Sequence, residues 1–166
     1  MTVGPPPAEE LAVRLRGVEG VSDVVVQSSR RLSARLNPAH VRAVLLRLRD
    51  AEGCWHLSAI SGVDTRASIE VVYHVSWRDG VVLSLKAAVP RDEPRIDSVV
   101  DVMPAANLYE RQAHDLLGVV FVGHPDLRRI LLNEDWPADE YPLRKDWKPD
   151  PRKRYGGPAT GGDARG

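Results

Sequence analysis

Two runs of alternating apolar residues constrain the fold of this chain more than any other feature. Residues 68–77 and residues 81–89 each place an apolar side chain at every second position: Ile69, Val71, Tyr73, Val75 and Trp77, then Val81, Leu83, Leu85, Ala87 and Val89. A period of two is the pattern of a β-strand with one buried face. The tripeptide Arg78-Asp79-Gly80 joins the two runs and is typical of a hairpin turn, because glycine adopts positive φ without strain. We therefore expect an antiparallel pair of strands with a shared apolar face.

Two amphipathic segments are expected to cover such a face. Residues 8–16 contain Leu11 and Leu15 four positions apart and suit a short helix. Asn37 as a cap and Pro38 at the first helical position predict the start of a second helix, which ends near Gly53. Its apolar side follows the helical spacing i, i+3, i+4, i+7: Val41, Val44, Leu45 and Leu48.

Three further segments are predicted to be strands. Residues 23–28 are rich in valine, residues 31–36 form a possible partner for them, and residues 55–60 end at the turn pair Ser61-Gly62. Helices combined with strands that are mostly joined as hairpins indicate an α+β fold. The expected architecture is a mostly antiparallel sheet with helices packed on one side.

A third helix is predicted to begin at Pro104 and to end at Gly118, a residue suited to the left-handed conformation after a helix. The short apolar run 119–122 that follows is read as an edge strand. Together these elements predict one α+β domain over residues 9–122. Residues 1–8, with three prolines in a row, and residues 156–166, with five glycines, are expected to be flexible or disordered tails.

Residues 123–155 are charged and punctuated by proline, and only residues 127–131 suggest a turn of helix. A segment of this length without a core of its own is either disordered or lies along another surface. Apolar and aromatic residues at intervals favour the second alternative: Leu127, Ile130, Leu131, Trp136, Tyr141, Leu143 and Trp147. We therefore predict an extended arm that takes its shape chiefly by lying against partner proteins.

Composition excludes several function classes. The formal net charge is +0, so nothing global indicates binding to nucleic acid or to acidic lipid. No apolar run approaches the roughly 18 residues needed to cross a bilayer, and the start of the chain does not resemble a signal peptide. Cys54 is the only cysteine, so the chain cannot supply the four thiolates of an iron–sulfur cluster. It also has no glycine-rich loop for a phosphate or a dinucleotide.

Glu110 and His114 lie four apart and hence on one helix face, where they could act as an acid–base pair or as metal ligands with His124 as a third. The alternative is ordinary i,i+4 pairing, with Arg111 and Asp115 as a second such pair. This structural interpretation is favoured, because a metal site needs three or four converging ligands.

The loop Gly123-His124-Pro125-Asp126 is read as a turn rather than as a catalytic loop. Basic residues of the arm (Arg128, Arg129, Arg144 and Lys145) are interspersed with acidic ones, which suits the salt bridges of a protein partner better than a phosphate backbone. An RNA-binding module therefore stays open only as a third hypothesis. Large aromatics in a segment without a core, such as Trp136 and Trp147, are expected to enter pockets of another subunit.

The stretch 108–147 resembles one known family, the thirty-kilodalton subunit of respiratory complex I, which is the C subunit of bacterial NADH-quinone oxidoreductase. The resemblance rests on a spaced motif: Glu110-Arg111-Gln112, Asp115, Leu116-Leu117, His124, Arg128 and Ile130-Leu131, followed by Pro142-Leu143-Arg144-Lys145-Asp146. Gln112 departs from a second glutamate of the family, and His114 and Leu117 stand where aromatic residues are more usual. The variant sequence also resembles related subunits of membrane-bound nickel–iron hydrogenases and formate hydrogenlyase-type complexes.

The resemblance implies a peripheral-arm subunit, on the cytoplasmic side of the membrane, that binds no cofactor itself. Its partners would be the subunit forming the quinone pocket, or its hydrogenase counterpart, and the subunit holding the terminal iron–sulfur cluster. The partner subunits would carry the iron–sulfur clusters, FMN and quinone, or nickel and iron. The residues expected at subunit interfaces are Glu110, Arg111, Asp115, Gly118, Gly123, His124, Pro125, Asp126, Arg128, Arg129, Trp136, Tyr141, Leu143, Arg144, Lys145, Asp146 and Trp147.

Overall fold

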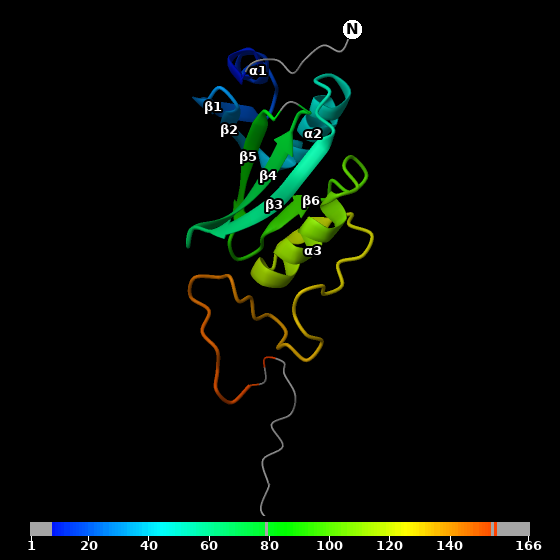
Figure 1. The fold of residues 1–166 in the computed structure, drawn as a ribbon. Coiled ribbons are helices and arrows are strands. Elements are labelled where there is room, and N and C mark those ends of the chain that lie inside the picture. Colours follow the sequence, from blue (N-terminus) through cyan, green and yellow to red (C-terminus); the bar gives the residue numbers. More distant parts are fainter. Residues whose placement is uncertain (1–7, 79, 154, 156–166) are drawn as a thin grey trace, which may run out of the picture.

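The structure is a computed structural model that describes residues 8–78, 80–153 and 155. Its centre is a five-stranded sheet in the order β1-β2-β5-β4-β3 (Figure 1). The strands are β1 (Val21–Ser28), β2 (Arg31–Leu36), β3 (His56–Asp64), β4 (Ser68–Ser76) and β5 (Val82–Pro90). Neighbouring strands are antiparallel, except that β2 and β5 run parallel. The predicted mostly antiparallel sheet is confirmed. The two predicted tails, apart from Ala8, and Asp79 of the predicted turn lie outside the described residues.

The register of the strands places the alternating apolar residues on one face of the sheet. Tyr73 of β4 lies opposite Leu85 of β5, and Val75 lies opposite Leu83. All four side chains are fully buried. The opposite face carries polar residues such as His74, whose ring is hydrogen-bonded to serines on both sides. The alternation in the sequence therefore corresponds to one covered face and one polar face, as expected for a sheet with helices on a single side.

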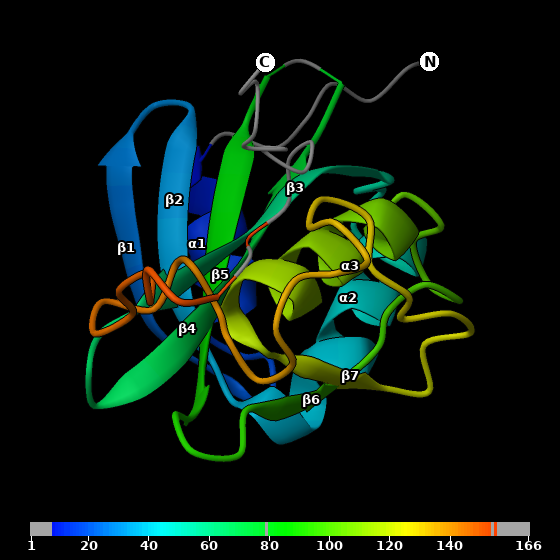
Figure 2. The same ribbon diagram turned by 90° about the horizontal axis from the view of Figure 1, so that it is seen from below.

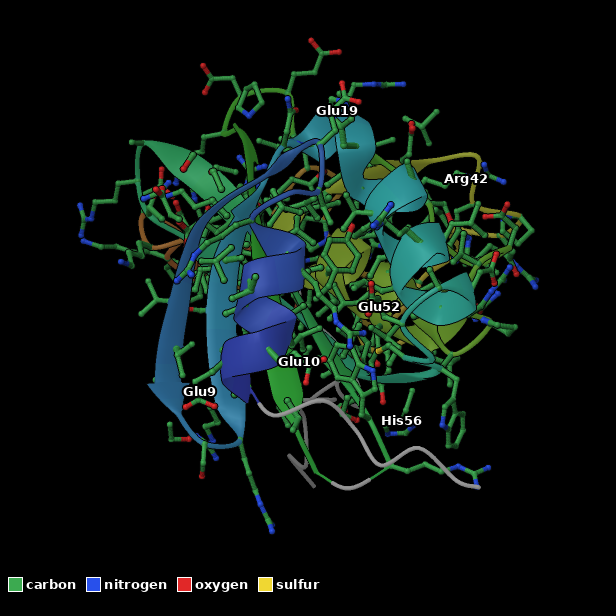
Figure 3. The ribbon with its side chains drawn as sticks, turned by 90° about the horizontal axis from the view of Figure 1, so that it is seen from above. Glu9, Glu10, Glu19, Arg42, Glu52 and His56 are labelled. Atoms are coloured by element: carbon green, nitrogen blue, oxygen red, sulfur yellow. The ribbon has the colours of Figure 1, made fainter. Side chains whose placement is uncertain are left out.

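Helices α1 (Ala8–Leu15), α2 (Val41–Asp50) and α3 (Ala106–Leu117) contribute apolar side chains to a single core with that face. Figures 1 and 2 show α1 at one end of the sheet and α3 at the other. The first helix begins at Ala8, which is buried and thus belongs to the domain rather than to the expected tail. Arg14 of α1 forms ion pairs with Glu10 and with Glu52, which follows α2, and Figure 3 shows both acids.

Asn37 caps the second helix, as the sequence predicts. Its side-chain oxygen accepts a hydrogen bond from the backbone N–H of Ala39 at 3.1 Å. The first turn, η1 (Pro38–His40), is a tighter 3-10 helix, and the α-helix proper begins only at Val41. Such tightening is common at helix ends, where several N–H groups lack a partner in the helix.

Strand β3 does not end at Ser61-Gly62, and this prediction is wrong. The strand continues to Asp64 in antiparallel pairing with β4. Gly62 serves close packing and not a turn, because a Cβ atom there would lie 2.1 Å from Cδ1 of Leu117. The missing side chain lets α3 approach the sheet.

The apolar run after α3 does form a strand, β7 (Val120–Val122), but not at an edge of the main sheet. It pairs in parallel with β6 (Arg95–Asp97) in a separate two-stranded sheet. The sequence analysis predicted no strand at residues 95–97, because three residues are too few to show a period. Strand β6 contacts α2 and β7 contacts α3, so the pair connects the two helices (Figure 2).

The arm, residues 123–155, contains no helix or strand among its described residues, so the helical turn predicted at residues 127–131 is wrong. It gathers beside α3, at the end of the molecule opposite α1 (Figure 1). Within the described part of the chain, no helix has the length and apolar character that crossing a membrane requires.

Candidate subunit interface

Two charged side chains of α3 bind consecutive pieces of the arm backbone. The Arg111 guanidinium donates hydrogen bonds of 2.9 and 3.0 Å to the carbonyl oxygens of residues 128 and 129. One Asp115 carboxylate oxygen accepts from the N–H groups of residues 130, 131 and 132, at 2.8, 2.8 and 3.3 Å. A backbone that belongs to neither helix nor sheet thus finds partners in side chains of the domain.

These contacts correct the predicted pairing along α3. Arg111 and Asp115 were expected to pair with each other, and Glu110 with His114. Instead, all four side chains have partners elsewhere in the described structure. His114 donates from Nδ1 to the carbonyl oxygen of Val119 at 2.8 Å. Spacing along a helix indicates which residues share a face, but tertiary contacts decide which groups they bind.

A second attachment joins the arm to the end of the sheet through Asp64. Its buried carboxylate accepts from the Arg91 guanidinium at 3.0 and 2.9 Å, and from the backbone N–H of Lys145 at 2.8 Å. Arg91 also forms an ion pair with Asp146. The Arg91 guanidinium holds the pKa of Asp64 well below its usual range. The stretch 145–146 is therefore tied to the last residue of β3.

A third attachment lies where α3 ends. Gly118 adopts a left-handed conformation with φ 78°, and the Tyr141 ring packs directly against its Cα. The Arg144 guanidinium lies 4.7 Å from the centre of that ring and donates to the carbonyl oxygen of Leu117 at 2.9 Å. The backbone N–H of Leu143 donates to the carbonyl oxygen of Leu116. Aromatic packing and hydrogen bonds thus hold residues 141–144 on the end of the helix.

The arm also has a small cluster of its own. Trp136 and Trp147 stack with ring centres 5.7 Å apart, and Tyr155 contacts both rings edge-on. The Glu140 carboxylate accepts from Trp147 Nε1 and from the Tyr155 hydroxyl, at 3.0 and 2.8 Å. Lys153 and Tyr155 hold the pKa of Glu140 below its usual range. In this structure both tryptophans are therefore half-buried within the arm.

The guanidinium of Arg129 links backbone groups within the same part of the arm. It donates to the carbonyl oxygens of Asn133 and Trp136, at 3.1 and 2.8 Å. With the three attachments, these bonds show that the arm takes much of its shape from its own chain. That partner proteins also shape the arm stays a prediction.

The first turn of the arm, residues 123–126, is organised by His124. Nδ1 of His124 accepts from the backbone N–H of Asp126 at 2.9 Å, so the ring proton lies on Nε2, which donates to the carbonyl oxygen of Asn107 at 3.2 Å. Gly123 has φ 83°, and Pro125 is exposed. Asp126 forms an ion pair with Arg128. The predicted turn is confirmed, with the imidazole as a structural hydrogen-bonding group.

Glu110 is completely buried, a position that the sequence analysis did not predict. Its carboxyl group accepts from Ser98 Oγ at 2.6 Å and from the backbone N–H of Val99 at 2.8 Å. Nε2 of His124 lies 4.0 Å from Oε2 of Glu110. Burial raises the pKa of Glu110 to about 7, against the lowering effect of the two hydrogen bonds. A carboxyl group in so dry a site favours the protonated form.

The structure gives no support to a metal site at Glu110, His114 and His124. His114 turns to Val119, away from the other two. Within residues 8–78, 80–153 and 155, no three His, Cys, Asp or Glu side chains are placed to hold a metal ion.

Several large apolar side chains along α3 and the arm stay exposed although the neighbouring backbone is bound. Leu131 is 50% exposed beside the Asp115 contact, and Leu143 is 55% exposed beside the end of α3. Leu108, one turn before Arg111, is 53% exposed, and Ile130 is 36% exposed. We call these four residues the apolar seam. Exposed apolar residues that gather into one patch mark protein–protein contact sites, whereas single ones are common on any protein surface.

A pocket of 280 Å³ lies beside this seam, between α3 and the arm. Its walls include His114, Leu132 and Tyr141, together with residues 138–140. Asp139 in that wall has φ 61°, a conformation that non-glycine residues rarely adopt and that costs roughly 1–3 kcal/mol. Strained residues of this kind cluster at functional surfaces.

Sequence reasoning missed four residues that fix the arm: Asp64, Arg91, Glu140 and Tyr155. Each acts across a long interval of the chain, for example 81 residues between Asp64 and Lys145. No local pattern marks such a pair. An isolated acid such as Asp64 is too common in a sequence to be informative.

The sequence matches the family described as respiratory-chain NADH dehydrogenase, 30 Kd subunit, over residues 34–153. The match covers most of the sheet, α3 and nearly all of the arm. This chain belongs to that family. One relative is the C subunit of F(420)H(2) dehydrogenase from Methanosarcina mazei, which is 39% identical over 138 residues, covering 81% of this chain and 87% of the relative. Another is the C subunit of NADH-quinone oxidoreductase from Moorella thermoacetica, 36% identical over 76% of this chain and 86% of the relative.

Some members of the family are longer: the match covers 57% of the corresponding NADH-quinone oxidoreductase subunit from Xanthobacter autotrophicus. Solved structures of related chains have the same fold. A chain from the membrane-bound sulfane sulfur reductase, an archaeal respiratory membrane complex, is 29% identical, with a TM-score of 0.74 over 84% of this chain and 85% of that chain. A trypsin-resistant fragment of Nqo5 gives a TM-score of 0.60 at 29% identity, over 72% of this chain and 98% of the fragment.

Proposed function

We propose that this protein is a structural subunit, without a cofactor of its own, in the peripheral arm of a complex I-type NADH-quinone oxidoreductase. It supports electron transfer from NADH to quinone by holding neighbouring subunits in place. The observation that carries the proposal is the family match over residues 34–153, and the exposed side chains of the apolar seam support it. Apolar residues fixed in place lose little entropy when a partner covers them.

The proposed interface residues then fall into two groups with different tasks. Most support the surface from behind, by holding the arm on the domain or by fixing its own turns: Arg111, Asp115, Gly118, Gly123, His124, Asp126, Arg129, Trp136, Tyr141, Arg144, Asp146 and Trp147. Glu110 is buried in the domain behind His124. The others, Pro125, Arg128, Leu143 and Lys145, are exposed and face the partner. Arg128 is the clearest of these, because its side chain is 85% exposed.

The proposed partners are the subunit that forms the quinone pocket and the subunit that holds the terminal iron–sulfur cluster. FMN, quinone and the clusters belong to partner subunits, and this chain lies peripherally on the cytoplasmic side of the membrane. Support comes from relatives whose names place them in respiratory dehydrogenases. The two names give different electron donors, F(420)H(2) and NADH. Identifying the partner subunits that purify with the tagged chain would show which donor its complex uses. Recovery of a nickel-ligating large subunit would instead assign the chain to a hydrogenase complex.

Introducing a charge on the seam tests the interface without disturbing the fold. Leu131→Glu and Leu143→Glu change exposed side chains, as do the matched controls Val13→Glu and Val25→Glu, which are 66% and 52% exposed on α1 and β1. We expect the seam variants to lower the amount of assembled complex at least about tenfold, since burying a charge costs several kcal/mol. The controls should assemble normally.

Thermal unfolding of each purified chain completes the experiment. All four variants should unfold within a few degrees of the wild type, because exposed substitutions change stability little. Normal assembly of a Leu131→Glu, Leu143→Glu double variant would refute the seam as an interface. Loss of assembly in the controls would show that the method is not specific.

A further inference from the structure

We propose that Glu110 is a proton-binding site that controls the first turn of the arm through His124. In this arrangement, loss of the proton from the carboxyl group draws Nε2–H of His124 away from Asn107 and loosens the turn at residues 123–126. The proposal goes beyond a structural role in assembly, because it makes the position of the arm depend on a proton held inside the domain.

The hydrogen bonds of Glu110 suit both protonation states of its carboxyl group. Oε1 accepts from the backbone N–H of Val99 whether or not the group is ionised. Oε2 lies 2.6 Å from Ser98 Oγ, and a hydroxyl can donate to a carboxylate or accept from a carboxylic acid. Ser98 Oγ in turn accepts from the backbone N–H of Val100 at 3.3 Å. The site therefore has partners in either state, which a purely structural carboxylate would not need.

Among the described residues, the charged and titratable groups around Glu110 include no cation that acts on it. His124 faces it from the arm at 4.0 Å, and its tautomer is fixed by Asp126 and Asn107. Tyr73 of β4 is fully buried, and its hydroxyl has no hydrogen-bond partner among the described residues. Asp101 acts from the loop after β6 and opposes ionisation. Beyond the hydrogen bonds from Ser98 and Val99, a negative charge on Glu110 can be stabilised further by a group that moves toward it.

His124 is the group that can move. Its Nε2–H bond to Asn107 is a neutral bond of 3.2 Å, whereas a carboxylate would offer a stronger, charge-assisted bond. The present distance of 4.0 Å to Oε2 is too long for a hydrogen bond, so the observed ring position suits the protonated carboxyl group. Turning the ring toward Glu110 pulls Nδ1 away from the Asp126 N–H. Gly123, at φ 83°, begins the turn that must absorb this change.

Nuclear magnetic resonance of the full chain tests the proposal directly. Carboxyl carbon shifts of labelled glutamate and the amide shift of Asp126 would be followed between about pH 5 and pH 9. We expect the Glu110 carboxyl, the Asp126 amide and the His124 ring to change with one common midpoint near pH 7. In Glu110→Gln, the transition at Asp126 should vanish, while His74 on the polar face keeps its own titration.

A second variant keeps the test decisive if Glu110→Gln folds poorly. Ser98→Ala removes a hydrogen bond that lowers the pKa of Glu110, so the common midpoint should move upward. The wild-type titration alone can overturn the proposal. A Glu110 midpoint below about pH 5, or an Asp126 amide that does not respond across the Glu110 transition, would show that the site is only structural.

Discussion

Arg111 and Asp115 lie one turn apart on α3 and bind one stretch of the arm backbone in complementary ways. Arg111 donates hydrogen bonds to carbonyl oxygens of this stretch, and Asp115 accepts hydrogen bonds from its N–H groups. The helix thus supplies the hydrogen-bonding partners that a strand would otherwise supply. A segment without secondary structure can in this way be held rigidly against its own domain while its apolar side chains stay exposed.

Asp115→Ala should release the middle of the arm. Three backbone N–H groups would lose their acceptor, which should cost at least about 2 kcal/mol of local stability. Hydrogen exchange at residues 130–132 should then accelerate roughly thirtyfold or more, with little change in the strands. Asp50→Ala is the control, because that carboxylate pairs with Arg49 on α2, away from the arm. Equal exchange in both variants would contradict the role given to Asp115.

Glu110→Gln should change how stability depends on pH. The folded-state pKa of about 7 lies above the ordinary 4.5, so the proton stabilises the fold. That stabilisation is complete below about pH 4.5 and is lost as the pH rises through 7. At pH 8 the variant should therefore be more stable than the wild type, by up to roughly 3 kcal/mol. Urea unfolding at pH 5 and pH 8 measures this, and a difference that is independent of pH would be inconsistent with a buried acid.

Asp64→Asn should change how folding stability depends on pH in the acidic range. Arg91 lowers the pKa of Asp64 below the ordinary 3.8, so the carboxylate contributes stability above about pH 4 and loses it as the pH falls further. The variant should be less stable at neutral pH and lose less on acidification. Asp101→Asn removes an exposed partner of Arg42 and should have a much smaller effect. Fluorescence of Trp136 and Trp147 would report whether the arm is released first.

Gly118→Ala should displace the arm from the end of α3. The new Cβ would lie 2.5 Å from the Tyr141 ring, and the residue must also keep φ at +78°. Gly53→Ala is a matched control, because Gly53 has φ +66° but no atom within 4 Å of its Cβ position. The control variant has only the cost of the backbone strain, about 1 kcal/mol. Any additional loss of stability in Gly118→Ala then comes from the clash. Gly118→Ala should cost clearly more in thermal unfolding, and equal losses would mean that Tyr141 simply moves aside.

The local pattern of the sequence determined which segments fold and how. Alternation set β4 and β5, Asn37 and Pro38 set the start of the second helix, and Gly118 set the end of the third. These signals are reliable because they arise from interactions within a few residues: strand period, caps and positive φ. The spaced motif of residues 110–146 also identified the family from sequence, although not the contacts that its residues make.

Only the tertiary structure decided the parallel pairing of β2 with β5, the burial of Glu110, and the use of Arg111, Asp115 and Asp64 to hold the arm. These features join residues that lie far apart in the chain. A charged residue looks the same in the sequence whether it faces solvent or satisfies buried backbone. The difference depends on which unpaired N–H and carbonyl groups the fold brings within reach, and that is a property of the packed chain.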